Sequence, residues 1–316
     1  MNNIWLQMTP AMIGYLTGLI YRNTRSSCCC LASLSAMAHD RFYRLLYADF
    51  PYSRRLWEWF ASRLVGANGY LIVDDTAWQR FTKRAEAVSF VWDSQVGKVV
   101  FGMNVVLLIW TDGKRKVPLG MRVWQKGAHS KIELAGEMFE RARENGVKPI
   151  YVLFDSWYSC NKLLNLLDSF GWHYIGRAKV NRVLEKVKIG KAFRHRFGRK
   201  VGNLRKVGHQ NLVVKDGRRF WLSNDLTLTS KNLKRHYRFR QQVEETFRLL
   251  KQEFGWSKCR AGTKKAQIAH LHLGLYALCL VQIKAGEETV YHFKQNLFRE
   301  AIPTQQQFIK LFTATA

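Results

Sequence analysis

Acidic residues are scarce in this sequence of 316 residues: 23 Asp and Glu stand against 51 Lys and Arg, a formal net charge of +28. So many positive charges repel one another in a compact fold, so we expect the protein to bind a polyanionic partner. DNA or RNA is the first candidate for that partner. A basic soluble protein without such a partner is the alternative. Hydrophobic residues make up 47% of the chain and aromatic residues 13%, which excludes a disordered tail and predicts a folded core.

Paired cysteines are missing as well. The six cysteines, at positions 28, 29, 30, 160, 259 and 279, include no CxxC pair and no Cys/His spacing that suits zinc. This excludes a zinc knuckle or a disulfide framework and is typical of reduced thiols in a cytosolic protein.

Long apolar runs are also absent. The two longest, residues 99–110 and 271–283, are shorter than the ~20 residues of a membrane helix. No charged segment precedes the N-terminal apolar stretch, as a signal peptide would require. We therefore expect a soluble, cytoplasmic protein that has no membrane partner.

The first 66 residues predict helices, because apolar residues recur at helical spacing. Within them, residues 31–49 predict a short helix, a turn and a second helix that Asp40 caps. Arg41 and Arg44 would lie on the exposed face of the second helix. This is the shape of a helix-turn-helix, whose second helix lies in a DNA major groove; a plain helical bundle is the alternative.

From residue 69 the pattern changes to short apolar strands. Two β-rich runs within residues 98–125 are joined at Asp112-Gly113, a dipeptide typical of a hairpin turn. The predicted order is three strands, helix, strand, helix and strand, over residues 69–78, 98–125, 130–146, 149–159, 160–170 and 172–179. A three-strand meander followed by βα alternation predicts an α/β fold with a ribonuclease-H-like mixed sheet and helices on its faces.

Residues 179–219 are one-sided in charge, with 14 Lys or Arg against two acids. Short β-like pieces and glycine turns run through this segment to Arg218 and Arg219. We expect a β-rich insertion that binds DNA phosphates; a solvated basic loop is the alternative. The expected domains are an N-terminal helical domain over 1–66, a ribonuclease-H-like domain over 67–262 with its insertion at about 180–230, and C-terminal helices over 263–316.

Residues 237–254 form an amphipathic helix on a wheel of about 100° per residue. Its apolar residues share one arc, and beside that arc lies a polar stripe of Tyr237, Arg240, Glu244 and Lys251. Glu245 falls roughly 100° from Glu244, among side chains that should face water. A carboxylate at the edge of a core is costly unless a cation or a metal meets it. We therefore expect Glu244 to be functional and Glu245 to be a surface acid, with an ordinary salt-bridged flank as the alternative.

Further acids follow two predicted buried strands. Asp74 and Asp75 end one strand and Asp155 ends another, and ligand sites in α/β sheets gather at the carboxyl ends of strands. Acids there in so basic a protein need a positive charge, which Mg²⁺ supplies beside phosphates. Two aspartates and a glutamate would hold two metals, one activating a water or 3′-hydroxyl and the other stabilising the leaving oxygen. Arg240 and Lys251 would clamp the phosphate under attack.

The spacing Tyr237-x2-Arg240-x3-Glu244-x6-Lys251 resembles, at every position, the Y-R-E-K signature of the transposases of the insertion-sequence 4 superfamily. VDDT (73–76) and LFDSWYS (153–159) are similar to the two Asp blocks of that family's DDE triad. The resemblance covers roughly residues 70–260. It implies that the catalytic and metal-binding residues are Asp75, Asp155 and Glu244, with Asp74 as the alternative to Asp75, and that the residues contacting DNA-end phosphates are Tyr237, Arg240 and Lys251.

The resemblance further implies a metal-dependent DNA transposase of a bacterial insertion sequence, cytoplasmic and nucleoid-associated. Such an enzyme binds terminal inverted repeats as a homodimer, cleaves the DNA ends and joins their 3′-hydroxyls to target DNA. Two Mg²⁺ ions, for which Mn²⁺ substitutes, serve the reaction. Trp221 lies near the region where relatives stack a flipped base, although we expect a core tryptophan there. A ribonuclease-H-like nuclease or resolvase that joins no strands, and a catalytically silent DNA-binding protein, are the alternatives.

Overall fold

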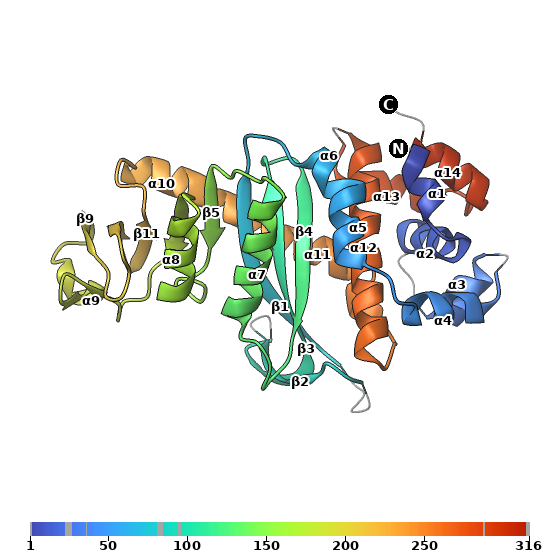
Figure 1. The fold of residues 1–316 in the computed structure, drawn as a ribbon, viewed down its shortest axis with the longest axis horizontal. Helices are drawn as coiled ribbons and strands as arrows, with labels where there is room; N and C mark the ends of the chain where they lie inside the picture. Colours follow the sequence, from blue (N-terminus) through green and yellow to red (C-terminus); the bar gives the residue numbers. More distant parts are fainter. Residues whose placement is uncertain are drawn as a thin grey trace. The chain divides into compact units, whose positions relative to one another are not determined.

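The computed structural model describes residues 2–22, 27–35, 37–80, 85–93, 96–286 and 288–313 (Figure 1). The chain divides into two compact units. We call residues 1–64, 76–105 and 245–316 the helix-rich unit, and residues 65–75 and 106–244 the sheet-rich unit. The elements with residues in both units are β1 (Tyr70–Gln79), β3 (Lys98–Thr111) and α11 (Gln241–Gln252).

The fold is α/β with one large mixed sheet, as the sequence predicts. Its strands pair in the order β2-β3-β1-β5-β6-β11-β10-β9, and β4 pairs with β3. Their bounds are β2 Ser89–Asp93, β4 Lys116–Trp124, β5 Tyr151–Phe154, β6 Tyr174–Arg177, β9 Phe197–Asn203, β10 Gln210–Asp216 and β11 Arg219–Ser223. β5 runs parallel to both β1 and β6, whereas the pairs β2–β3, β6–β11, β11–β10 and β10–β9 are antiparallel.

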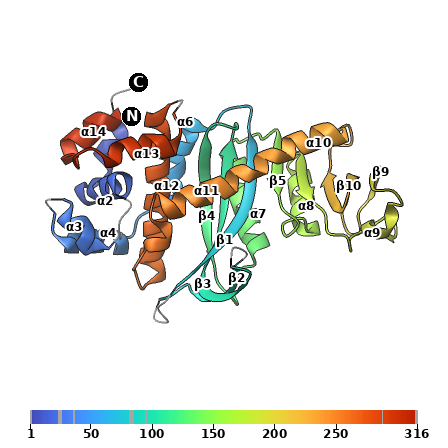
Figure 2. The same cartoon turned by 180° about the vertical axis from the view of Figure 1, so that it is seen from behind.

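Helices cover both faces of the strands in the sheet-rich unit. α7 (Lys131–Glu144) and α8 (Asn161–Ser169) lie in front of these strands in Figure 1, and the view from behind brings α10 (Ser230–Tyr237) to the front (Figure 2). α7 begins with a capping box, in which Ser130 Oγ accepts from Glu133 N and the Glu133 carboxylate accepts from Ser130 N. Such a box satisfies two unpaired amides and fixes where the helix starts.

The hairpin predicted at Asp112-Gly113 joins β3 to β4. Gly113 has φ +100°, a conformation that glycine adopts without steric cost. A Cβ at this position would lie 2.7 Å from the ring of Phe239, in the 3-10 turn η2 (Arg238–Arg240). Because glycine has no Cβ, the hairpin can pack against Phe239, in the segment that carries Arg240.

The basic segment forms strands that extend the sheet. β11 pairs with β6, β10 with β11, and β9 with β10, so the segment builds one end of the strand order. A short side hairpin and a helical turn complete it: β7 (Val183–Leu184), β8 (Val187–Lys188) and α9 (Ile189–Ala192). Trp221 is buried, as expected of a core tryptophan, with the Arg177 guanidinium 4.6 Å from its ring centroid.

Helices make up most of the helix-rich unit, at both ends of the chain as predicted. They are α1 Asn2–Gln7, α2 Pro10–Tyr21, α3 Cys28–Ser33, α4 His39–Tyr47, α5 Tyr52–Leu56, η1 Trp57–Ala61, α6 Ser62–Leu64, η3 Trp256–Lys258, α12 Lys264–Ala285, α13 Val290–Phe298 and α14 Gln305–Thr313. α12 packs against α2, α4, α5 and α13. The unit's core is therefore arranged around α12.

The second apolar run, residues 271–283, lies inside the 22-residue α12, which polar residues extend on the N-terminal side of the run. By length and composition this helix could cross a membrane, but 89% of its apolar window is buried inside the protein. Both ring nitrogens of its buried His270 are paired within the unit: Nδ1 lies 2.8 Å from the hydroxyl of Tyr15 and Nε2 lies 3.0 Å from the carbonyl of Gly255. α12 is thus a core helix.

The prediction that Asp40 caps the second helix of the helix-turn-helix was wrong. α4 begins at His39 after Ala38, whose side chain cannot cap, so Asp40 lies inside the first turn and forms an ion pair with Arg44 one turn on. Hydrogen bonding to Arg44 lowers the pKa of Asp40. Arg41 and Arg44 are exposed, as the predicted recognition face requires, while Phe42 is buried.

Candidate active site

In the sheet-rich unit β5 lies beside the first residues of β1. β1 runs from Tyr70 to Gln79, so Asp74 and Asp75 lie inside this strand, and the prediction that they end it was wrong. Asp155 directly follows β5, as predicted.

The parallel register of β1 and β5 pairs Tyr70 with Tyr151 and Ile72 with Leu153. Continuing that register by two residues brings Asp74 level with Asp155, just beyond β5. Asp155 itself lies outside the strand, and its carboxyl is near enough to Asp74 to raise the pKa of that residue.

Asp74 is a buried carboxyl held by one cation. Its Oδ2 lies 2.8 Å from Arg240 Nη2, and its Oδ1 accepts a hydrogen bond from the amide of Asp75 at 2.9 Å. The Asp74 side chain is only 13% exposed. Burial raises its pKa to about 7, against the lowering effect of Arg240, and the nearby carboxyls of Asp155 and Asp75 raise it further. Acidic groups are therefore crowded at this point.

Glu244 joins the same group through Arg240. Arg240 Nη1 lies 2.5 Å from Glu244 Oε1, so one guanidinium bridges Glu244 and Asp74. Glu244 stands in the first turn of α11, and its side chain is 53% exposed. It therefore keeps access to solvent and to a substrate while its charge is partly balanced.

Asp155 forms the turn between β5 and α8. Its Oδ1 accepts hydrogen bonds from the amides of Trp157 at 2.8 Å and Tyr158 at 3.3 Å, an arrangement typical of an Asx turn. Within the described residues its Oδ2 has no hydrogen-bond partner, so one oxygen is available to a ligand. Tyr237 donates its hydroxyl to the carbonyl of Phe154 at 3.3 Å, which ties the end of α10 to the end of β5. Burial raises the pKa of Tyr237, so its hydroxyl stays a donor.

Asp75 lies in a different network. Its Oδ2 lies 2.5 Å from Lys131 Nζ, at the start of α7, and its Oδ1 accepts from the hydroxyl of Tyr158 at 3.0 Å. Successive residues of a strand point to opposite faces, which explains why Asp74 and Asp75 have different partners. The sequence analysis did not identify Lys131 as a site residue. Tyr158 lies three residues after Asp155, but it was not identified as a partner of Asp75 either.

Lys251 belongs to the helix-rich unit. Its Nζ donates to the carbonyl of Ala77 at 2.9 Å and lies 5.7 Å from the ring centroid of Trp78. Burial lowers the pKa of Lys251. The lysine is thus fixed against β1.

The helical wheel was wrong about exposure at the two glutamates. Glu244 is exposed and Glu245 is half-buried, the reverse of the prediction. Thr246 is fully buried, so the buried face of α11 extends beyond its apolar residues toward the side of Glu245. The 3-10 turn over Arg238–Arg240 also changes the angular step before α11 begins.

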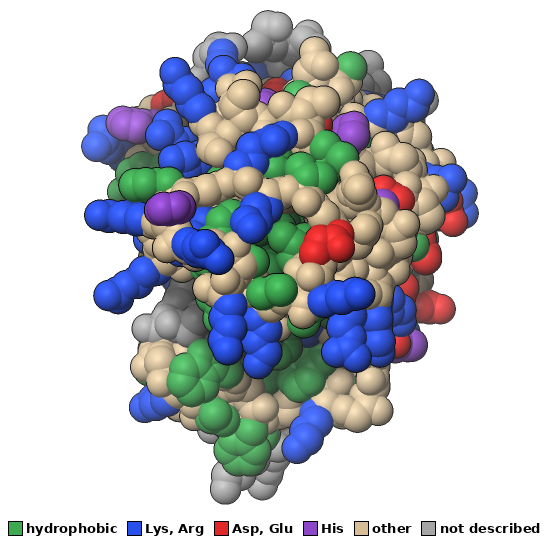
Figure 3. All heavy atoms as spheres, turned by 90° about the vertical axis from the view of Figure 1, so that its left-hand side faces the viewer, with side chains coloured by type: hydrophobic (Ala, Val, Ile, Leu, Met, Phe, Trp, Pro, Cys, Tyr) green, Lys and Arg blue, Asp and Glu red, His purple; other side chains and the backbone are tan. Residues whose placement is uncertain are grey.

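Basic side chains gather on the outer strands of the sheet-rich unit. Arg218 and Arg219 are exposed at the β10–β11 turn. Figure 3 views the molecule from the side where β9–β11 lie in Figure 1, and it shows many Lys and Arg side chains and few acidic ones. This face is electrostatically suited to a polyanion.

Comparisons with known proteins bear on the family and the fold of this chain. A family model described as "Transposase DDE domain" matches residues 68–280. A search of curated proteins found no match. The chain is similar to the cryo-EM structure of a piggyBac transposase synaptic complex with hairpin DNA: the TM-score is 0.53 at 15% identity, over 95% of this chain and 71% of that one. This likeness shows a shared fold.

Two nucleases are similar at lower scores. They are the NurA nuclease from Sulfolobus solfataricus (TM-score 0.30, 11% identity, 64% of this chain and 82% of that one) and Endonuclease V from Ciona intestinalis (TM-score 0.28, 11% identity, 58% and 87%).

Proposed function

Since the chain belongs to the transposase DDE-domain family, we propose that it is a DNA transposase of the insertion-sequence 4 type. It binds the terminal inverted repeats of its element, cleaves the DNA ends and joins the 3′-hydroxyls to target DNA. One observation carries this proposal: within the family match, Arg240 bridges Asp74 on β1 and Glu244 in the first turn of α11, and the carboxyl of Asp155, just after β5, lies near enough to raise the pKa of Asp74.

The proposal assigns the first acid to Asp74. The family resemblance favours Asp75, but Asp75 pairs with Lys131 and Tyr158, whereas Asp74 shares Arg240 with Glu244 and lies level with Asp155. Asp75 is the competing assignment. Asp74→Asn and Asp75→Asn separate the two: the variant that loses cleavage while it still binds DNA marks the ligand.

The donor chemistry of these acids fits a hard divalent cation. Three carboxylates offer oxygen ligands. Burial raises the pKa of Asp74 to about 7 and the nearby carboxyls of Asp155 and Asp75 add to this, so a divalent cation would stabilise the ionised form. Among the described residues no three His, Cys, Asp or Glu side chains are grouped as a metal site, and Arg240 pairs with two of these three acids. Asp74, Asp155 and Glu244 would hold two Mg²⁺ ions, or Mn²⁺. The chemistry so supplied is Lewis-acid activation of the nucleophile and neutralisation of the leaving oxygen.

Arg240 is the residue that changes partner in this mechanism. In the free protein its guanidinium neutralises Asp74 and Glu244. A DNA phosphate takes a guanidinium in the same two-pronged way as a carboxylate, so Arg240 turns from the acids to the phosphate when substrate and metal bind. Tyr237, anchored to Phe154, and Lys251, fixed against β1, are the other phosphate contacts.

DNA binding beyond the site is assigned to two basic regions. Arg218 and Arg219 lie on the strand-rich insertion at about 180–230, and Arg41 and Arg44 lie on the exposed face of α4. The similar piggyBac transposase forms a synaptic complex with hairpin DNA, which supports two DNA ends held by a homodimer here. The proposed domains stay at 1–66, 67–262 and 263–316, in a cytoplasmic, nucleoid-associated bacterial protein.

The test is cleavage of a labelled duplex that bears the element's own ends, with Mg²⁺ and with EDTA. Wild type should nick at the element boundary only with Mg²⁺, and Asp155→Asn should not. Asp168→Asn, an aspartate on α8 that pairs with His209 at 3.2 Å, is the matched control. Nicking without transfer to a second duplex would favour a ribonuclease-H-like nuclease or resolvase, and binding without nicking a catalytically silent DNA-binding protein.

A further inference from the structure

Exposed apolar side chains gather on the hairpin of β2 and β3 in the helix-rich unit. Phe90 is 72% exposed, Trp92 62%, Val96 55% and Val99 57%. We call these four residues the hairpin patch. Trp92 pairs with Val99 in the antiparallel register of the two strands, and such pairs lie on the same face of a sheet. Single exposed apolar residues are normal, whereas neighbouring ones mark an interaction surface.

The alternation of β2 builds this patch. Val91 and Asp93 are buried, so Phe90 and Trp92 point to the opposite face of the strand. The ring of Phe90 meets the ring of Phe101 edge to face, with 5.4 Å between the centroids. This contact gives Phe90 one neighbour and leaves most of its side chain exposed. The hairpin therefore presents an aromatic face that the unit itself does not cover.

β2 is also an edge strand. It stands first in the strand order, so one of its edges pairs with no strand among the described residues. Edge strands usually carry charged side chains that prevent another strand from adding, and β9, at the other end of the order, exposes Arg199 and Lys200. β2 has no Lys or Arg, and its one charged residue, Asp93, is buried. The β2 edge therefore lacks the feature that blocks strand addition at β9.

A second copy of this chain fits the β2 edge. Two β2 strands related by a two-fold axis at Val91 would pair antiparallel, and such a contact uses the same surface on both copies. Phe90 of each copy would then lie opposite Trp92 of the other. Aromatic pairs across an antiparallel ladder stabilise it. The strand is thus complementary to itself in both its backbone and its side chains.

Charge favours a second copy over DNA at this surface. With a net charge of +28, two copies repel each other, so they can approach most closely where basic side chains are absent, as on β2. DNA is bound through Lys and Arg, which this strand does not offer. The patches and strand edges of two copies would bury on the order of 1,000 Å² in total, which is about the minimum for a specific dimer contact.

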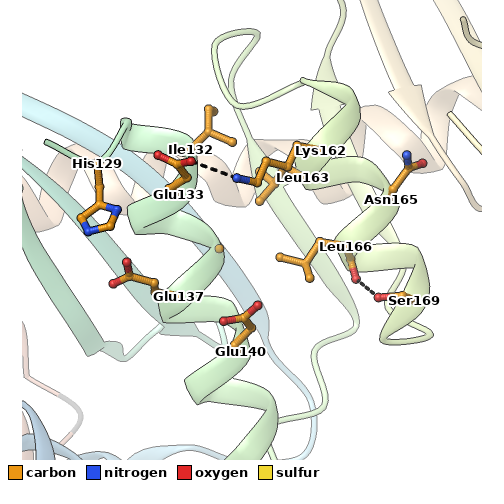
Figure 4. Close-up of a pocket in the computed structure, with 11 residues that line it drawn as sticks. His129, Ile132, Glu133, Glu137, Glu140, Lys162, Leu163, Asn165, Leu166 and Ser169 are labelled. Atoms are coloured by element: carbon orange, nitrogen blue, oxygen red, sulfur yellow. Dashed lines mark hydrogen bonds and ion pairs between the residues drawn. The ribbon is translucent and has the colours of Figure 1, made fainter. Parts of the chain in front are cut away.

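A hollow in the sheet-rich unit shows the contrast. It measures about 520 Å³ and lies between α7 and α8 (Figure 4). Its Glu133 pairs with Lys162 at 3.1 Å, and its Glu137 pairs with Arg122 at 3.4 Å. These charges are balanced within the chain, whereas the apolar side chains of the hairpin patch stay exposed. The hairpin patch is therefore the stronger candidate for a contact with another molecule.

We propose that the β2 edge and the hairpin patch form the contact between two copies of this chain. The two β2 strands pair antiparallel about Val91, and their sheets become one continuous sheet. Trp92 of each copy packs against Phe90 of the other. This contact would serve the homodimer of the proposed function, and in that role it rests on that function.

Sedimentation of the full-length, DNA-free protein tests the contact. The buffer holds about 0.15 M salt, in which charges more than about 8 Å apart are largely screened. Wild type should form a dimer as its concentration rises. Trp92→Lys should raise the dissociation constant about thirtyfold or more, as expected when a central interface aromatic is lost. Tyr291→Lys is the matched control, because Tyr291 is an aromatic residue of the same unit, 53% exposed on α13, and should leave the dimer unchanged.

Two cysteine variants test the register and keep the test valid if Trp92→Lys fails to fold. Oxidation of an equimolar mixture of Phe90→Cys and Trp92→Cys should give disulfide-linked dimers, because these positions lie opposite each other and the second Phe90–Trp92 pair stays intact. Either variant alone should cross-link far less, since two residues at one position are diagonal neighbours about 7–8 Å apart. Oxidised wild type is the control for the native cysteines, of which Cys29 is exposed.

The outcomes separate this inference from the proposed function. A monomeric wild type, or a dimer that Trp92→Lys does not weaken, would overturn the contact. Equal cross-linking by the mixture and by either variant alone would overturn it as well. Weaker binding of a DNA duplex by Trp92→Ser, with the dimer unchanged, would assign the patch to DNA and also overturn the proposal. Cleavage of the labelled duplex by wild type tests the transposase separately, so the contact can fail while the proposed function stands.

Discussion

Replacing Arg240 should destabilise the protein in a way that depends on pH. Arg240→Gln removes the cation that bridges Asp74 and Glu244. The Arg240 and Asp74 side chains are only 17% and 13% exposed, so Asp74 would be left buried without a counter-charge. Losing one partner of a buried pair costs about 3–5 kcal/mol; since Glu244 stays solvated, we expect about 2–4 kcal/mol at about pH 8.

The direction of the pH effect follows from Asp74. Its folded-state pKa, raised from 3.8 to about 7 by burial, lies above the unfolded value. The folded state therefore binds the proton more tightly, and stability is full below about pH 4 and is lost as the pH rises through about 7. Without Arg240 the folded pKa rises further. At about pH 5 Asp74 is protonated in wild type and variant alike, so the variant should lose only about 1 kcal/mol there.

Urea unfolding in EDTA, followed by tryptophan fluorescence, measures both losses. Arg122→Gln is the matched control, because Arg122 pairs with Glu137 at 3.4 Å with both side chains more exposed; it should cost less than about 1 kcal/mol at either pH. Adding Asp74→Asn to Arg240→Gln should recover stability at about pH 8, since the unpaired carboxylate is gone. Equal losses of unfolding free energy at both pH values would contradict the expectation that Arg240→Gln leaves Asp74 as a carboxylate without a counter-charge.

Three further outcomes are expected. Glu244→Gln should abolish cleavage and leave binding of the DNA ends within about threefold, whereas Glu245→Gln should cleave at near wild-type rates, as measured on labelled duplexes. Arg218→Gln with Arg219→Gln should reduce the slope of log affinity against log salt by about 0.9 for each DNA phosphate that the protein no longer neutralises. Burial lowers the pKa of Lys294 to about 7, so its folded state loses the proton before the unfolded state does; stability should rise from about pH 7 to 10, and Lys294→Met should flatten that rise in urea unfolding.

Local signals in the sequence predicted several elements. Asp112-Gly113 predicts its hairpin because the turn chemistry is contained in two residues. Asp155 was correctly assigned to the end of a strand, because buried strands have a recognisable apolar pattern. Asp74 and Asp75 were not, since β1 continues past them to Gln79, and β2 was not predicted. The β-strands of the basic segment could also be predicted from the sequence. The pairing of this segment with β6 of the main sheet could not, because strand partners are determined by tertiary packing.

The different partners of Asp74 and Asp75 could not be predicted from the sequence. Both lie inside β1, where a shift of one residue moves a side chain to the other face of the sheet. Only the structure shows that Asp74 pairs with Arg240 and Asp75 with Lys131.

The position of β9 at the end of the strand order has a consequence for handling the protein. An outermost strand offers free amide and carbonyl groups to which another chain can add, the first step of β-aggregation. β9 carries exposed Arg199 and Lys200 among its solvent-facing residues, and their mutual repulsion between copies blocks that step. Salt at about 1 M shortens the range of this repulsion to about 3 Å. DNA-free protein should therefore stay monodisperse in dilute buffer and self-associate through β9 when the salt is raised.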